Sequence, residues 1–301
     1  GEPQHNSDSA GRRLRKSRYD SVDSYLTTRE WNDVPLEMNE RVRQRLLESG
    51  VDALLAEHMA HLFVRDPLVI FSENINLDDT RSMDHFENIQ STNWQTMRFK
   101  PPPHGGHTGW RVEFRPMEIQ LTDFENAAFC IFLTLLSRVI MTMPVDFGMP
   151  ISLVDVNMQR AQRRDAIHSQ RFHFRSSRHT SQTQEYTLAD IFHGNAGDDT
   201  MPGLLPLVHS YLDSLNMSET ERQRLNRYLD LVAMRVDGRL MSTATYIRQF
   251  VQQHPAYRHD SVVSDEINYD LLCTLDRIER GEYEVPDFMP AWFAAYRRER
   301  K

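Results

Sequence analysis

The chain has 301 residues, of which 40% are hydrophobic and 26% are charged. This composition is typical of a globular chain with a sizeable core, and the length corresponds to about two domains. The formal net charge of −8 argues against a protein that wraps nucleic acid, because phosphate binding needs a net positive surface. The only cysteines, Cys130 and Cys273, lie far apart, which argues against a disulfide framework and favours a cytoplasmic protein.

The first part of the chain predicts a solvated tail followed by two helices. Residues 1–17 are polar and end in a basic stretch, as in a tail or loop. Asn39 is placed to cap the first helix and Gly50 to end it. One face of the second helix is apolar and carries Leu54, Leu55, His58, Met59, Leu62 and Phe63. We expect His58 to be a core histidine.

Two strands are predicted next. Residues 91–100 alternate, with one face formed by Trp94, Thr96, Arg98 and Lys100. Three prolines end this strand, since proline cannot donate to a ladder. Residues 110–121 alternate again, and Pro116 indicates a bulge or an edge position. The short connection favours antiparallel pairing, which brings the two polar faces to one side.

The second strand has charge on one face only. Burial of Val112 and Phe114 would gather Arg111, Glu113 and Arg115 on the other side. That face is either a solvent-facing surface with opposite charges or the wall of a cleft. In a cleft, a carboxylate can hold a divalent cation and a guanidinium can grip a carboxylate or phosphate. For Trp94 and Arg98 the alternatives are a core tryptophan with a surface arginine, or the wall of a pocket for a small charged ligand. Alternation alone does not decide between them.

The rest of the chain reads as mainly helical. Thr122 and Glu125 form a capping box that opens an apolar helix, in which we expect Cys130 to be buried and inert. The apolar run 127–136 is too short to span a bilayer. Ser152 and Asp155 predict another helix start.

Farther along, residues 176–186 are rich in Ser, Thr and Gln and predict an exposed loop, and N-caps stand at Ser218 and Ser264. The fold class is therefore α+β. We expect a sheet-containing part in residues 18–150 and a mainly helical region in residues 151–301.

Two long stretches carry a resemblance to a known family. Residues 85–103 (HFENIQSTNWQTMRFKPPP) and 109–126 (GWRVEFRPMEIQLTDFEN) closely resemble the eukaryotic glutamate–cysteine ligase catalytic subunit. Shorter matches extend the likeness over roughly residues 15–280, at 16–21, 58–67, 164–166, 202–204 and 260–269.

The resemblance implies a glutamine-synthetase-like fold, in which a curved, mainly antiparallel sheet forms a funnel surrounded by helices. It also implies the first step of glutathione synthesis. ATP phosphorylates the γ-carboxylate of glutamate, and the amine of cysteine attacks the resulting γ-glutamyl phosphate. The cofactors implied are ATP and Mg²⁺ or Mn²⁺, and a modifier subunit is implied as a partner.

Site residues follow from the matched positions. The resemblance implies that Glu113 is a metal ligand and that Arg115 is the catalytic contact to substrate or phosphate. It places Trp94, Arg98 and Tyr19 in the glutamate pocket. Glu118 fits either a functional or a structural role.

The chain is shorter than the family's catalytic subunit. The catalytic subunit has an additional N-terminal half, which supplies most of the metal-binding carboxylates. With Gly1 in place of Met, this predicts a fragment that is inactive alone. The alternative is a non-catalytic interaction module derived from the ligase. Retention of the polar cluster at Glu113 and Arg115 favours the ligase.

A basic segment leaves a further choice. Residues 158–179 contain six arginines and one acid, Asp165. The arginines suit nucleic acid, with Phe172 and Phe174 stacking on bases, or the phosphates of ATP. In a third alternative, the arginines form salt bridges elsewhere and the two phenylalanines lie on a half-buried strand. The acidic balance of the whole chain favours ATP, and we expect neither nucleic-acid nor membrane partners. The histidine pairs at 58/61 and 104/107 lack a third ligand, so we expect no histidine metal site.

Overall fold

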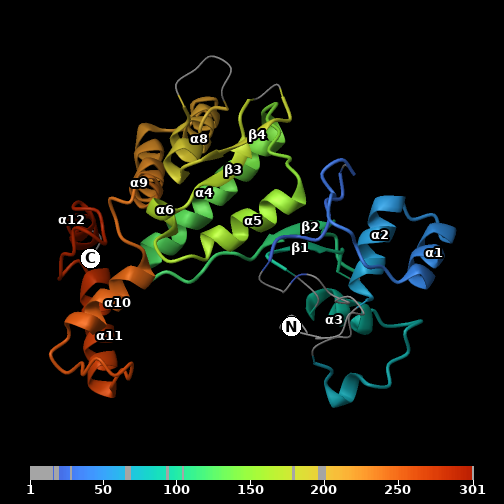
Figure 1. Cartoon of the computed structure of the whole chain (residues 1–301), viewed down its shortest axis with the longest axis horizontal. Helices are drawn as coiled ribbons and strands as arrows, with labels where there is room; N and C mark the ends of the chain where they lie inside the picture. The colour runs from blue at the N-terminus through green and yellow to red at the C-terminus, as the bar shows by residue number, and fades with distance from the viewer. Residues whose placement is uncertain are drawn as a thin grey trace. The chain divides into compact units, whose positions relative to one another are not determined.

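The computed structural model describes residues 16, 20–27, 29–64, 69–92, 95–103, 105–177, 180–195 and 201–299, without the side chains of 91 and 92. The chain forms two compact units (Figure 1). Unit 1 comprises residues 1–117 and 148–162, and unit 2 comprises residues 118–147 and 163–301. Helices predominate, and the described strands form two short antiparallel pairs. The α+β class is therefore confirmed, although the units do not coincide with the expected division at residue 150.

Unit 1 consists of a helix pair, a hairpin and flanking helices. Its helical elements are α1 (Glu40–Glu48), α2 (Ala53–Leu62), η1 (Ser72–Asn74), α3 (Asp84–Thr92) and α5 (Ile151–Ala161). The predicted caps of α1 are confirmed. Asn39 accepts a hydrogen bond from the Val42 N–H at 3.2 Å, and Gly50 takes a positive φ of 83° beyond the last turn.

The predicted hairpin is present but shorter than expected. Strand β1 (Met97–Lys100) pairs antiparallel with β2 (Arg111–Phe114). The first strand does not begin at residue 91, because that segment belongs to α3. The second does not continue to residue 121. The Arg115 N–H still donates to the Thr96 carbonyl at 2.7 Å, and Pro116 follows without a donor.

Burial on the hairpin is the reverse of the prediction. Val112 and Phe114 are 53% and 46% exposed, whereas Arg111 and Glu113 are half-buried. The charged side chains are partly covered because they bond to one another and to the backbone; Arg111 donates to the Pro101 carbonyl at 3.0 Å. The apolar side of the hairpin instead faces a cavity.

Unit 2 is a helical assembly with one strand pair. Its elements are α4 (Asp123–Thr142), α6 (Ala166–Ser169), β3 (Phe172–Arg175), β4 (Thr183–Tyr186), α7 (Leu188–His193), α8 (Leu204–Asp213), α9 (Glu219–Val236), α10 (Thr243–Gln253), α11 (Asp265–Glu279) and α12 (Phe293–Arg298). The capping box predicted at Thr122 and the N-caps predicted at Ser218 and Ser264 are confirmed, and Ser218 also forms a capping box with Glu221.

Three local predictions were wrong. Part of the expected loop 176–186 is strand β4, because it pairs with β3. Helix α5 starts at Ile151 rather than at a Ser152 cap, since the Ser152 hydroxyl donates to Asp33 instead. Cys130 is exposed, because it lies on the side of α4 that faces away from the core.

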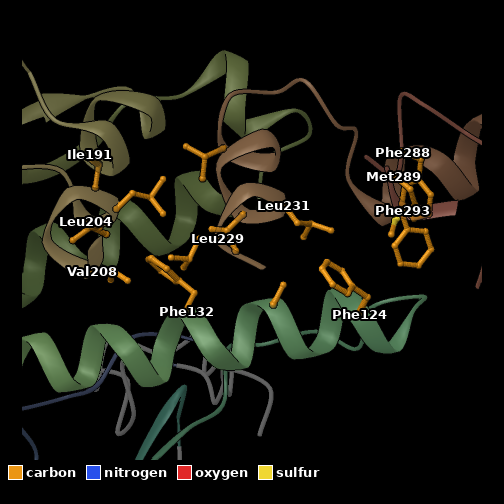
Figure 2. Close-up of a cluster of buried hydrophobic side chains, with 14 of the residues drawn as sticks. Phe124, Phe132, Ile191, Leu204, Val208, Leu229, Leu231, Phe288, Met289 and Phe293 are labelled. Atoms are coloured by element: carbon orange, nitrogen blue, oxygen red, sulfur yellow. The ribbon is translucent and has the colours of Figure 1, made fainter. Parts of the chain in front are cut away.

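The core of unit 2 forms where α4 packs against α8 and α9. Figure 2 shows Phe124 and Phe132 of α4 pointing toward side chains of the facing helices, among them Leu204, Val208, Leu229 and Leu231. Among the described helices, α4 alone has the length and hydropathy to cross a membrane, and it is longer than the apolar run 127–136. One side of α4 packs against α8 and α9, and Glu125 forms a buried ion pair with Arg235 of α9, but only 28% of the most apolar stretch of α4 is buried.

Candidate functional site

Five charged side chains share one side of the β1–β2 hairpin, which we call the ionic face: Arg98, Lys100, Arg111, Glu113 and Arg115. The register sets Arg98 opposite Glu113 and Lys100 opposite Arg111, and opposite residues of an antiparallel pair project to the same side. Arg115 follows β2 directly. Its N–H continues the ladder to Thr96, so the alternation carries its side chain to the same face.

Glu113 is the centre of this arrangement. Its Oε2 lies 2.8 Å from Arg98 Nε and 3.4 Å from Arg115 Nη1. The side chains are 38% exposed for Glu113, 11% for Arg98 and 24% for Arg115. The residues expected to act together therefore do meet, in a partly desolvated position where charge–charge interactions are stronger than in bulk water.

The charge balance of the ionic face favours anions. It has four cationic groups and one carboxylate. Arg111 is engaged with the backbone of Pro101, whereas Arg98 and Arg115 both point to Glu113. Guanidinium groups bind carboxylates and phosphates in a planar, two-point geometry. An anion with two oxygens can therefore compete with Glu113 for this pair of arginines.

Sequence comparison identifies the family. A sequence model of the glutamate–cysteine ligase family matches residues 2–278. This chain belongs to the glutamate–cysteine ligase family. It is 46% identical to the glutamate–cysteine ligase catalytic subunit of Mus musculus over 93% of the chain. The identity is 47% to glutamate–cysteine ligase of Schizosaccharomyces pombe over 89% of the chain, and 40% to that of Saccharomyces cerevisiae over 95%.

The chain spans about half the length of these curated relatives: 47% of the mouse protein, 42% of the fission-yeast protein and 46% of the budding-yeast protein. The resemblance found in the hairpin motifs is thus confirmed for the family.

The divalent cation expected from the resemblance would meet a single carboxylate on the ionic face, that of Glu113. The described residues contain no group of three or more His, Cys, Asp or Glu side chains placed around one metal position. Both ion pairs of Glu113 involve its Oε2. One protein carboxylate suits Mg²⁺, which is usually held by one or two carboxylates together with substrate phosphates.

The other residues expected at a functional site do not join the ionic face within the part of the chain that the structure describes. Tyr19 and Trp94 lie outside the described residues. Glu118 is exposed and belongs to unit 2. Phe172 and Phe174 lie on β3 as predicted, but Phe172 is buried and Phe174 packs on Phe147 at 5.7 Å, so neither presents a ring for base stacking.

Sequence reasoning missed a buried polar network beside the hairpin. Asp23 Oδ2 lies 2.7 Å from His61 Nε2 and accepts a hydrogen bond from Gln95 Nε2 at 2.5 Å. His61 Nδ1 lies 2.6 Å from the Glu37 carbonyl. His61 and Gln95 are both buried. The network ties α2 to the residues that lead into β1, and thereby fixes where the strand carrying Arg98 begins.

Proposed function

We propose that this chain provides part of the active site of an ATP-dependent ligase that forms γ-glutamylcysteine from glutamate and cysteine, the first step of glutathione synthesis. The observation that carries the proposal is the position of Glu113 between Arg98 and Arg115. Family membership supports it, since the relatives are named glutamate–cysteine ligase.

The proposed chemistry assigns separate tasks to the three side chains. Arg98 holds a carboxylate of glutamate through its guanidinium fork. Arg115 is aimed at the phosphoryl group that passes from ATP to the γ-carboxylate, where fixed positive charge stabilises the developing charge. The family reaction then proceeds by attack of the cysteine amine on γ-glutamyl phosphate, with phosphate as the leaving group.

Glu113 acts in two states in this proposal. Without substrate its carboxylate neutralises the two arginines and keeps them in place. When an anion takes the guanidinium groups, Glu113 loses its counter-charges and becomes a ligand for the divalent cation. That cation, when bound with ATP, spreads the negative charge of the transferring phosphoryl group.

The wider family features are part of the same proposal. An isolated two-stranded hairpin is only marginally stable, so β1–β2 suits a place within a larger, funnel-shaped antiparallel sheet of the glutamine-synthetase type. Tyr19 and Trp94 are proposed to complete the glutamate pocket. We also propose a modifier subunit as a partner and a cytoplasmic location.

A segment exchange tests the proposal. In the mouse relative, the segment that aligns with this chain is replaced by these 301 residues, and γ-glutamylcysteine formation is measured with ATP, Mg²⁺, glutamate and cysteine. We expect activity that depends on all four components. The 301 residues alone should show little activity. A folded chimera without activity would contradict the proposal and favour a non-catalytic interaction module.

A further inference from the structure

The side of the hairpin opposite the ionic face borders a cavity of about 430 Å³. The cavity is enclosed by residues 22–27, by α2 and by Met97, Phe99 and Val112 of the hairpin. Arg98 of the ionic face also borders it. Cavities of this size, with mainly apolar walls and a few polar groups, are typical of small-molecule sites.

The apolar wall is unusual for a short hairpin. Met97 and Val112 are 38% and 53% exposed, although apolar side chains at the centre of a domain are normally covered. Phe99 presents its ring to the same space and stacks on Trp110 with centroids 4.6 Å apart. The exposed apolar surface is therefore a concave wall that an apolar ligand can cover, with the release of water.

One polar side chain on the cavity wall has unused hydrogen-bonding capacity. His58 lines the cavity and meets the Phe99 ring edge-on at 6.3 Å. Within the described part of the chain, no hydrogen bond reaches either ring nitrogen of His58. Burial, followed by the nearby His61, lowers the pKa of His58 to about 4. The ring is neutral at pH 7, with one N–H donor and one nitrogen acceptor.

Two charged side chains of the wall, Asp23 and Arg98, are already engaged. The Asp23 carboxylate is held by His61 and Gln95, and Arg98 is paired with Glu113. A charged ligand that lies against the apolar wall, away from the Arg98 guanidinium, would leave water without gaining a counter-charge, which is costly in an apolar site. An uncharged ligand avoids this cost and can still bond to His58.

We propose that this cavity is a binding site for a small uncharged molecule with an apolar, preferably aromatic, body and one hydroxyl or amide group that hydrogen-bonds to His58. The body lies against Met97, Phe99 and Val112. Arg98, which has a role in the proposed ligase activity, borders this cavity. The apolar body, however, binds on the opposite side of the hairpin from Glu113, so binding here and ligase activity can be tested separately.

The test uses 4-fluorobenzyl alcohol as the probe and ¹⁹F NMR of the 301-residue chain at pH 7. We expect saturable binding in the millimolar range or tighter. The charged analogues 4-fluorobenzoate and 4-fluorobenzylamine should bind at least about tenfold more weakly. Non-saturable binding of the alcohol, or equal affinity for the charged analogues, would overturn the proposal.

Two variants locate the probe, with circular dichroism as the check on folding. Val112→Trp fills the cavity from an exposed position and should abolish saturable binding. Val262→Trp, at a 63% exposed valine of unit 2, is the matched control and should leave it unchanged. His58→Phe keeps a ring but removes both nitrogens, and should weaken binding about fivefold to tenfold. Unchanged binding in either Val112→Trp or His58→Phe would contradict the proposal.

Discussion

Replacing Arg115 by lysine in the active chimera is expected to lower kcat about 10²–10³-fold. Lysine keeps the positive charge but loses the planar two-point geometry that suits phosphate and carboxylate oxygens. The loss should appear mainly in kcat, because the proposal gives Arg115 its strongest interaction in the transition state. The measurement is steady-state formation of γ-glutamylcysteine at saturating ATP and Mg²⁺.

Arg111→Lys is the matched control for this prediction. Arg111 lies on the same strand and the same face, but it donates to the Pro101 carbonyl, a bond that lysine can also make. We expect its kcat to stay within about threefold of the unaltered chimera, since surface-level changes of this kind are worth a few tenths of a kcal/mol. Equal losses of kcat in Arg111→Lys and Arg115→Lys would contradict a specific role of Arg115 in phosphoryl transfer.

The buried ion pair of unit 2 gives the largest expected effect on stability. Glu125 and Arg235 have side chains only 0% and 8% exposed and meet at 2.5 Å. Burial lowers the pKa of Arg235, and the facing Glu125 opposes that shift. Glu125→Gln keeps the shape but leaves a buried guanidinium without its counter-charge. We expect a loss of about 3–5 kcal/mol in the free energy of unfolding.

No alternative partner offsets this loss within the described residues. Nε and Nη1 of Arg235 have no hydrogen-bond acceptor there, and the group otherwise lies over the Phe288 ring at 4.7 Å. Native-state hydrogen exchange of the α4 and α9 amides measures the effect locally, because those helices contain both residues.

Two further variants separate the ion pair from helix capping. Ser218→Ala removes the exposed capping box of α9 and should cost only about 1 kcal/mol. The double variant Glu125→Gln with Arg235→Met should recover much of the loss, because no buried charge remains unpaired. A loss in Glu125→Gln no larger than that in Ser218→Ala would show that the pair is solvated.

Features with a local cause were predictable from the sequence. The caps at Asn39, Thr122, Ser218 and Ser264 are confirmed, because capping depends on a side chain and the backbone within one turn. The antiparallel pairing of β1 and β2 was also predictable, since one short connection joins two alternating segments.

Burial on the hairpin was not predictable, because it depends on distant segments. Alternation correctly separated Val112 from Glu113, but it could not say which side is covered. The cover comes from cross-strand pairing on the ionic face. Segments 22–27 and α2 leave the apolar side open to the cavity, and no periodicity in β2 reports on them.

The candidate site was predictable only where it depends on strand register. Arg98 and Glu113 come together through strand register, which alternation indicates. The contact of Asp23 with His61 and Gln95 joins three segments that are far apart in the sequence. His61 and Gln95 lie in stretches that resemble the family, but no sequence pattern indicates that they meet Asp23. Strand β4 was missed because its Ser/Thr/Gln composition resembles a loop, and only its pairing with β3 makes it a strand.

In the proposed function, the ionic face binds substrate and is more than a paired strand surface. Exchanging its two opposite residues, Arg98→Glu together with Glu113→Arg, retains the cross-strand ion pair and the net charge but reverses which side of the face is positive. In the active chimera, we predict an unchanged circular dichroism spectrum and a loss of γ-glutamylcysteine formation of at least about 10²-fold. Retention of activity by the folded, charge-exchanged chimera would contradict the account.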